Sequence, residues 1–338
     1  MPKCDGFHFF MNLPAYTKEP ISYRDQAELL KSRGMGDDID YIEEKLRTVN
    51  YYRLSAYWFE AWEINEDGSH KDEFKEGTKF STVWERYAFD RRLRLCIMDA
   101  IERIEVDFKT TFVNVLTLKT GDPFAHFNEA NFPNFPIVKK SSNPSKPDKV
   151  IDFSKTQSRI RQDVDKSCEE FVAQHRRKYS GIMPFWKTCE VISFGTISVL
   201  FEGLDNHTKR EIATRYKMSA IVLEDAIKHL CYLRNLCAHH SRVWNRNMAI
   251  KFTLPNKKNN PVFHNPISIP NQKIFGSMSL LKHFMDIIAP QSRWTKSFID
   301  LIEEHPNIPL SAMQMPENWR EYELWSHKFE NSILTKPI

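Results

Sequence analysis

The sequence predicts an all-α protein. Apolar residues recur at spacings of three and four along several long stretches, as they do on the buried face of an amphipathic helix. Glycine is scarce, with 10 residues in a chain of 338, so few tight hairpin turns are expected. No stretch alternates apolar and polar residues in the way that a half-buried strand does. We therefore expect helices joined by loops along the whole chain.

Helix-start and helix-stop residues place the first helices. Ser22, with Asp25 three residues later, forms a capping-box pattern, and Gly34 follows the expected helix 23–33. Two further helices are expected at 38–48 and 51–63, before a polar turn flanked by Gly68 and Gly77. The helix at 51–63 has an aromatic face, which we interpret as core rather than as a surface that stacks on bases. That face consists of Tyr51, Tyr52, Leu54, Tyr57, Trp58 and Trp62.

The longest helical pattern runs over 81–119 and is closed by Gly121. As a single helix it would be about 58 Å long, which is long enough to admit a break or a bend. Its buried stripe consists of Ile97, Ile101, Ile104, Phe108, Phe112 and Val115.

Two proline-rich segments, 121–153 and 255–273, predict loops. The second loop is expected to end the main domain, which divides the chain into an N-terminal helical region (1–78), a helical domain (79–255) and a C-terminal helical extension (256–338). Pro184 suits the first turn of a helix and Ser219 suits an N-cap. The remaining helices are expected at 155–178, 184–203, 206–217, 220–239, 277–288, 291–304 and 317–331.

Composition and motifs exclude several classes of protein. The chain has neither G-x-G-x-x-G nor G-x-x-x-x-G-K-[ST], which disfavours nucleotide-binding folds built on those loops. No apolar stretch approaches the roughly 18 residues that span a bilayer, and the N-terminal twenty residues lack the apolar core of a signal peptide. We therefore expect a cytoplasmic protein that needs no membrane and no cofactor. Its six cysteines are scattered without C-x-x-C, so we expect reduced core residues.

The segment 229–246, HLCYLRNLCAHHSRVWNR, concentrates groups that bind phosphate and transfer protons. The whole chain carries a mild net charge of +4, but residues 205–251 contain nine Lys or Arg against four Asp or Glu. This local excess of +5 predicts a basic surface around the segment. The candidate residues are Arg234, Asn235, His239, His240, Arg242, Asn245 and Arg246.

Helix geometry relates these candidates to one another. Asn235 and His239 are four residues apart and share a helix face, and Arg242 follows on that side if the helix continues. Arg234 and His239 are five apart, about 140° around an ideal helix, so they converge poorly within one straight helix. They would converge if the helix loosens near Ala238 or if a second copy supplies the partner groups.

A metal site is the alternative interpretation of the same segment. His229, Cys231, Cys237 and His239, with His240 adjacent, are all metal-ligand types. Cys231 and Cys237 are six apart, however, so on one helix they point about 120° from each other. Zinc ligands usually come in close pairs from separate elements, and we favour helix-core cysteines and no metal.

The residue types suit cleavage of RNA without a metal. A histidine with a pKa near 6.5 can take or give a proton at neutral pH, and an arginine can stabilise the charge of a phosphorane transition state. The 2′-OH of the RNA serves as the nucleophile, which predicts a 2′,3′-cyclic phosphate and a 5′-hydroxyl as products, and predicts that DNA is inert.

Arg234 to His239 matches the R-x4–6-H signature of HEPN ribonucleases, and RNLCAHHSRVWNR resembles the signature of Abi-like (abortive infection, AbiD/AbiF type) bacterial proteins. Other segments agree in order and spacing across about residues 15–250. They are ISYRDQAELLKSRGM, NYYRLSAYW (50–58), FKEGTKF (74–80), YAFDRRLRLCIMDAIERIEVDFKT (87–110) and EVISFGTISVLFEGL (190–204).

The resemblance implies an all-helical HEPN-like bundle with additional N- and C-terminal helices, and an endoribonuclease acting in phage defence or toxin-like growth arrest. It implies a homodimer whose two motifs meet in one composite site, and a small RNA as a possible further partner. Arg234, His239 and Asn235 would be catalytic, with His240 replacing or assisting His239. Arg242, Asn245 and Arg246 would contact RNA, or the two arginines would form structural ion pairs. A non-catalytic module that holds a guide or antitoxin RNA is the alternative function.

A second charged set lies on the long helix expected at 81–119. Spacings of three and four make several of its members neighbours on the helix surface. We favour a solvated face or ion pairs to a neighbouring helix over an RNA track or a dimer contact. The set consists of Asp90, Arg91, Arg92, Arg94, Glu102, Arg103 and Glu105.

Overall fold

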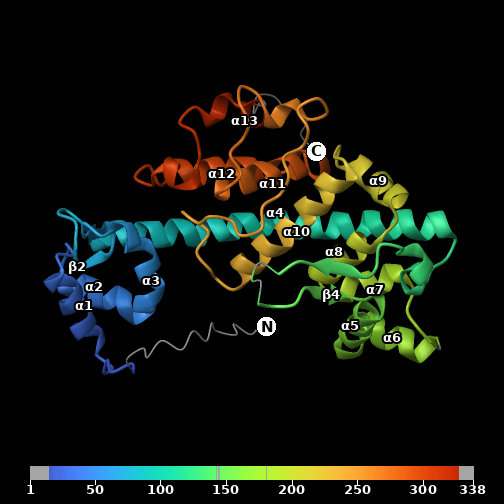
Figure 1. The fold of residues 1–338 in the computed structure, drawn as a ribbon, viewed down its shortest axis with the longest axis horizontal. Coiled ribbons are helices and arrows are strands. Elements are labelled where there is room, and N and C mark those ends of the chain that lie inside the picture. The colour runs from blue at the N-terminus through green and yellow to red at the C-terminus, as the bar shows by residue number, and fades with distance from the viewer. Residues whose placement is uncertain (1–14, 142, 144, 180, 327–338) are drawn as a thin grey trace, which may run out of the picture. The chain divides into compact units, whose positions relative to one another are not determined.

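The computed structural model describes residues 15–141, 143, 145–179 and 181–326. Over these residues the chain is 60% helical, with 13 α-helices and two small two-stranded sheets, which confirms the all-α prediction (Figure 1). No helix among the described residues is long and apolar enough to cross a bilayer. The expectations for Cys4 and for the first 14 residues lie outside the described residues, as does the end of the helix expected at 317–331.

The chain divides into two compact units, Met1–Tyr87 and Ala88–Ile338. The boundary falls within one helix, and residues on both sides of position 255 share the second unit. The three-part division expected from the sequence stays a prediction.

The first unit begins with a pair of packed helices, α1 (Tyr23–Ser32) and α2 (Ile39–Thr48). The capping box is present, since the Ser22 hydroxyl accepts from the amide of Asp25 while the Asp25 carboxylate accepts from the amide of Ser22. Gly34 ends α1 with φ +92°, a conformation in which glycine has no Cβ to clash. These boundaries agree with the sequence prediction to within a residue.

The third predicted helix is shorter than expected. Helix α3 (Tyr51–Trp58) gives way to a 3₁₀ turn and then to strand β1 (Trp62–Ile64), which pairs antiparallel with β2 (His70–Phe74). The Trp62 ring stacks on Phe74 with centroids 3.9 Å apart, so a cross-strand aromatic pair replaces the last turn of the predicted helix. The aromatic face is core at Leu54, Tyr57 and Trp58, whereas Tyr52 is 70% exposed.

Helix α4 (Phe80–Thr120) is continuous over 41 residues, without the break that its length would admit. Its predicted stripe is core at Ile97, Ile101, Ile104, Phe108 and Phe112, which are at most 1% exposed, whereas Val115 is half-buried. In the second unit α4 lies between two groups of helices, with α11 (Ile274–Ile288), α12 (Trp294–Glu303) and α13 (Glu323–Ser326) on one side and the helices of residues 153–203 on the other (Figure 1).

Two predicted helices are each split in two. The helix expected at 155–178 consists of α5 (Phe153–Lys166) and α6 (Glu170–Lys178), and the helix expected at 184–203 consists of α7 (Phe185–Val191) and α8 (Phe194–Gly203). A serine lies at each break. The Ser167 hydroxyl accepts from the amide of Glu169, and the Ser193 hydroxyl accepts from the amide of Thr196 as the N-cap of α8. These local bonds compete with helix continuation.

The loop expected at 121–153 contains a hairpin that the sequence pattern did not predict. Strand β3 (Ile137–Lys139) pairs antiparallel with β4 (Lys149–Ile151), and Lys139 lies opposite Lys149. Three-residue strands are too short to show alternation, which explains why the pattern did not indicate them. Helices α9 (Asn206–Arg215) and α10 (Ala220–Ala238) follow as expected.

The C-terminal helices form part of the core of the second unit. Every residue of α11 from Ile274 to Met285 is buried. The Trp294 indole donates to the carbonyl of Cys96 on α4 at 2.8 Å, and His283 bonds the carbonyl of Tyr216 at 2.9 Å. Residues after 255 therefore contact both the long helix and the segment that leads into α10.

Candidate functional site

The predicted motif lies at the C-terminal end of α10. The amide of His239 bonds the carbonyl of Asn235 at 3.0 Å, so this residue still follows the line of the helix as its C-cap. His240 then adopts φ +55°, and its amide bonds the carbonyl of Cys237 at 2.9 Å, while the amide of Ser241 bonds the carbonyl of Leu236 at 2.8 Å. This pair of bonds is a Schellman motif, with histidine in the left-handed position that glycine usually takes.

The catalytic candidates are on the surface of the second unit. Asn235, His239 and His240 are exposed and Arg234 is half-buried. The Arg234 guanidinium lies 3.4 Å from the side-chain oxygen of Asn235, to which it donates. Because the His239 amide bonds one turn back, Asn235 and His239 keep the shared face that their spacing predicts.

A buried ion pair on α4 holds the segment that follows the motif. The Asp90 carboxylate accepts from the amide of Trp244 at 2.7 Å and from the amide of Val243 at 3.2 Å. Arg94 forms an ion pair with Asp90 and also donates to the carbonyl of Ser241 at 3.4 Å. Asp90 is fully buried and Arg94 is 5% exposed, so the expectation of a solvated face is wrong for these two residues. The Asp90 carboxylate and the Arg94 guanidinium form hydrogen bonds with the main chain that leads away from α10.

The three expected RNA contacts lie beyond the end of the helix. Arg242 was expected on the face of Asn235 and His239 only if the helix continued. Because α10 ends at Ala238, Arg242 does not lie on that face of the helix. Arg246 donates to the carbonyl of Arg242 at 3.4 Å. Asn245 has φ +49°, and its side-chain oxygen accepts from Lys273, just before α11. The C-terminal helices thus contact the motif segment directly.

Arg234 faces an open hollow against α4. The hollow, about 420 Å³ in volume, is also lined by Asp99, Glu102 and Glu105. Two of these carboxylates have cationic partners on the same helix, since Arg103 lies 3.1 Å from Asp99 and Lys109 lies 2.9 Å from Glu105. The expectation of ion pairs to a neighbouring helix is met by Arg92, which pairs with Glu304 at the end of α12. Glu102 is the third carboxylate that lines the hollow with Arg234.

Of the metal-ligand types in the segment, His229 and Cys237 are buried in the core and Cys231 is half-buried, whereas His239 and His240 are exposed. His229 is buried, with Nδ1 donating to the carbonyl of Ile250 at 2.6 Å and Nε2 accepting from the Ser277 hydroxyl at 2.9 Å. Burial lowers the pKa of His229 to about 4 and raises the pKa of the Cys231 and Cys237 thiols to about 12. Within the described residues, no three His, Cys, Asp or Glu side chains are arranged to hold a metal ion.

The other cysteines fit the reduced-core expectation only in part. Cys189 is buried, whereas Cys168 is exposed between α5 and α6. All five cysteines in the described part of the chain are free thiols.

A second basic region, which the motif does not indicate, lies at residues 139–161. This stretch contains seven Lys or Arg against two Asp or Glu, a local net charge of +5 that equals the excess around the motif. The interpretation that the positive charge gathers around the motif is therefore incomplete. A count of charge along the chain would have found this region, which the structure shows as the β3–β4 hairpin and the start of α5.

Comparison with known proteins identifies the family of this chain. The model of the Abi-like protein family matches residues 44–245, more than half of the chain. The chain belongs to the Abi-like protein family. This membership implies an abortive-infection protein. No curated protein and no solved structure matches the chain significantly.

The matched region begins within α2 and ends at Asn245. It therefore includes the β3–β4 hairpin, the Asp90–Arg94 pair and the whole motif of α10. Helices α11–α13 lie outside it, although Lys273 and Ser277 bond residues inside it.

Proposed function

We propose that this Abi-like protein is an endoribonuclease of the HEPN type that acts in defence against phage. The observation that carries the proposal is the R-x4-H string at the end of α10, with Arg234, Asn235 and His239 accessible from solvent in a member of the abortive-infection family. The resemblance of this string to the HEPN signature and to the AbiD/AbiF type supports the same activity.

Each residue type has a role in the proposed reaction. His239 or His240 takes the proton from the 2′-OH, which attacks the adjacent phosphorus. The bond from phosphorus to the 5′-oxygen of the next nucleotide breaks, and that oxygen leaves as a hydroxyl after taking a proton from the other histidine or from water. Arg234 stabilises the negative charge on the phosphorane, and Asn235 orients the phosphate or the arginine to which it is bonded. The products are a 2′,3′-cyclic phosphate and a 5′-hydroxyl. The reaction needs no metal or other cofactor because the nucleophile belongs to the substrate.

Helix geometry favours the composite site of a homodimer. Arg234 and His239 are about 140° apart around an ideal helix, so within one straight helix they converge poorly on one phosphate. Two copies that pair through the ends of α10 would bring the Arg234 of one chain to the His239 of the other. Arg242, Asn245 and Arg246, in the segment that follows, would contact the RNA backbone on either side.

Cleavage by the purified protein tests the activity. We expect labelled single-stranded RNA to be cut to fragments with 2′,3′-cyclic ends, and DNA of the same sequence to stay intact. Arg234→Ala and His239→Ala should each lower the rate at least about 100-fold, since general acid–base catalysis alone contributes that much. Arg161→Ala, on an exposed position of α5, is the control. Tight binding without cleavage by the wild type would favour the non-catalytic module that holds a small RNA.

Complementation between inactive chains tests the dimer. A mixture of Arg234→Ala and His239→Ala chains forms some heterodimers in which one composite site has both native residues. We expect partial recovery of cleavage in the mixture, while each variant by itself stays inactive. An inactive mixture whose heterodimers are confirmed by mass spectrometry contradicts the composite site.

A further inference from the structure

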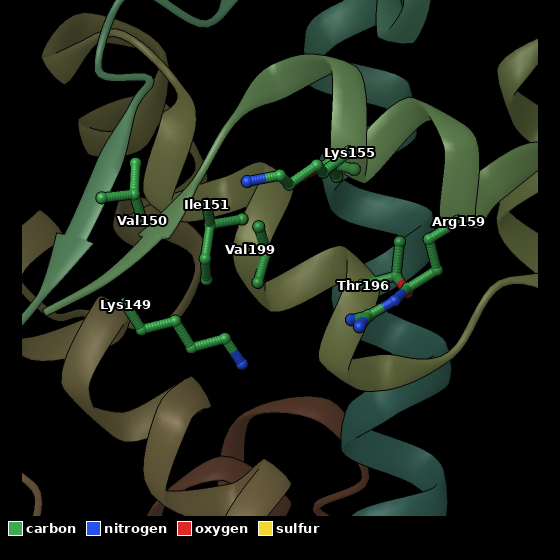
Figure 2. Close-up of a pocket in the computed structure, with 8 residues that line it drawn as sticks. Lys149, Val150, Ile151, Lys155, Arg159, Thr196 and Val199 are labelled. Carbon is green, nitrogen blue, oxygen red and sulfur yellow. The ribbon is translucent and has the colours of Figure 1, made fainter. Parts of the chain in front are cut away.

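A pocket with a cationic rim lies on the β3–β4 hairpin and the first turns of α5, apart from the motif of α10. Lys149, Lys155 and Arg159 surround it, as Figure 2 shows. The volume of the pocket is about 120 Å³, which is below the roughly 300 Å³ at which pockets for whole small molecules begin. It therefore suits one anionic group of a larger ligand. Its other lining residues are Val150, Ile151, Thr156, Thr196 and Val199.

The charges around this pocket are not balanced within the described part of the chain. Lys155 pairs with Asp152 at 2.8 Å, but no carboxylate of the described residues lies within 4.0 Å of the cationic atoms of Lys149 or Arg159. Lys149 also lies directly opposite Lys139 in the hairpin register, and Lys139 pairs with Glu202 at 3.5 Å. Lys149 and Arg159 are therefore the cations of the pocket that a bound anion would balance.

Helix α5 begins at the pocket, where Lys155 and Thr156 belong to its first turns. Thr196 of α8 also lines the pocket, but its amide is already bonded to the Ser193 hydroxyl. The N-cap residue of α5, Asp152, makes no side-chain bond to the amides of that helix. The N-terminal dipole of α5 therefore favours a negative group.

The pocket is connected to the motif through packed helices. Helix α8 contacts both α5 and α10. On its surface Glu202 pairs with Lys139 of the hairpin at 3.5 Å and with Lys228 of α10 at 2.9 Å. Lys228 precedes Arg234 by six residues, about 9 Å along the helix. A strand of nucleic acid that reaches the end of α10 could extend to the hairpin.

We propose that the pocket lined by Lys149, Lys155 and Arg159 binds a backbone phosphate of a nucleic-acid strand. The choice of RNA as that strand rests on the proposed function. The site recognises the phosphate group and not the 2′-OH, so it holds the strand without taking part in cleavage.

The test compares two charge reversals on one helix. Arg159 and Arg161 are two residues apart on α5, about 200° around the helix, and only Arg159 lines the pocket. Both are exposed, so neither change removes core packing. Binding of a labelled 12-nucleotide uridine RNA, and of the matching DNA, is measured by fluorescence anisotropy at several KCl concentrations in a His239→Ala background.

We expect Arg159→Glu and Lys149→Glu each to raise the Kd for both strands about tenfold, with Arg161→Glu changing it less than about twofold. The slope of log Kd against log salt concentration should fall by about 0.7 for each phosphate that is no longer neutralised. Equal effects of Arg159→Glu and Arg161→Glu overturn the proposal, as does absence of binding to either strand at low salt.

Inorganic phosphate is the second probe. If Arg159→Glu abolishes binding of free phosphate but leaves both strands unaffected, the pocket serves a small anion and the proposal of a strand site is wrong. The nuclease is tested separately. If the wild-type protein never cleaves RNA, the proposed nuclease activity is refuted. The phosphate site still stands if Arg159→Glu weakens binding of the strands and Arg161→Glu does not.

Discussion

The Asp90 carboxylate on α4 accepts the backbone amide of Trp244, 154 residues later, at 2.7 Å. Asp90 is fully buried, and its charge is balanced by Arg94 one turn further along the same helix. Arg94 in turn donates to the carbonyl of Ser241. The main chain that leaves the motif is thus held by a charged pair in the core.

Asp90→Ala is expected to destabilise the protein by about 3–5 kcal/mol, because it leaves the Arg94 charge buried without its partner. The loss is measured as the change in the free energy of unfolding in urea. Asp99→Ala is the matched control on the same helix. Asp99 pairs with Arg103 at a position where both side chains are 46% exposed, so its removal should cost less than about 1 kcal/mol. Similar losses for the two variants would contradict the proposed role of Asp90.

The burial of Asp90 shows what the sequence could not predict. Spacing along a helix identifies Asp90 and Arg94 as neighbours, but the burial of one helix face depends on which segments pack against it. Here the covering segment comes from 241–244, far along the chain. Spacings of three and four put Arg94 and Asp90 in line with the buried stripe that begins at Ile97, but they do not name the covering segment, and the charged residue types favour a solvated face.

Boundaries marked by side-chain caps were predicted well. The capping box at Ser22 and the N-cap at Ser219 both lie where the sequence places them. The errors occur where a serine turns the chain inside an otherwise helical pattern, at Ser167 and Ser193, and where strands of three residues are too short to alternate. The end of α10 was predicted to within one residue, but not the left-handed conformation of His240.

Two substitutions of His240 separate the effect of its backbone conformation on stability from the effect of its imidazole on catalysis. At φ +55° any residue with a Cβ is strained, whereas glycine is not. His240→Gly should therefore be more stable than His240→Ala by about 1 kcal/mol, because both lose the imidazole but only alanine keeps the strain. Thermal unfolding measures the difference. If the two variants unfold at the same temperature, the Schellman turn at the end of α10 is not formed as described.

The RNA cleavage rates of the same two variants address which histidine transfers the proton. If His239 does so, both His240 variants keep activity within about tenfold of the wild type, while His239→Ala loses it. If His240 does so, both of its variants are inactive regardless of their stability.

The stability of the protein should fall as the pH is lowered from 7 to 4.5. Burial lowers the pKa of His229 to about 4, against an ordinary value near 6.5. Between these two values the unfolded chain binds a proton that the folded chain does not, so protonation favours unfolding. The expected loss from this residue is about 2 kcal/mol, measured by urea unfolding at each pH.

His229→Gln should reduce this dependence but not abolish it, because burial also lowers the pKa of His126, to about 3, and that of His283. The control is Phe252→Leu, since the Phe252 ring lies 5.2 Å from the His229 ring and has no group that titrates. It should lower stability by a similar amount at every pH and leave the slope unchanged. A slope that His229→Gln does not alter would show that other groups cause the acid sensitivity.

Glu102 on α4 is expected to oppose RNA binding at the motif. It lines the same hollow as Arg234, and its neighbours Asp99 and Glu105 have their own cationic partners. Removal of this one charge lowers the negative potential in the hollow beside Arg234. Because both groups are accessible to water, the effect is modest, and Glu102→Gln should tighten RNA binding by about two- to fivefold.

Glu211→Gln is the control, because Glu211 is an exposed carboxylate on α9, and it should leave the Kd unchanged. The gain should vanish in an Arg234→Ala background, because the guanidinium through which Glu102 acts is then absent. A gain that persists there would mean that Glu102 repels RNA directly and that Arg234 does not contact the strand.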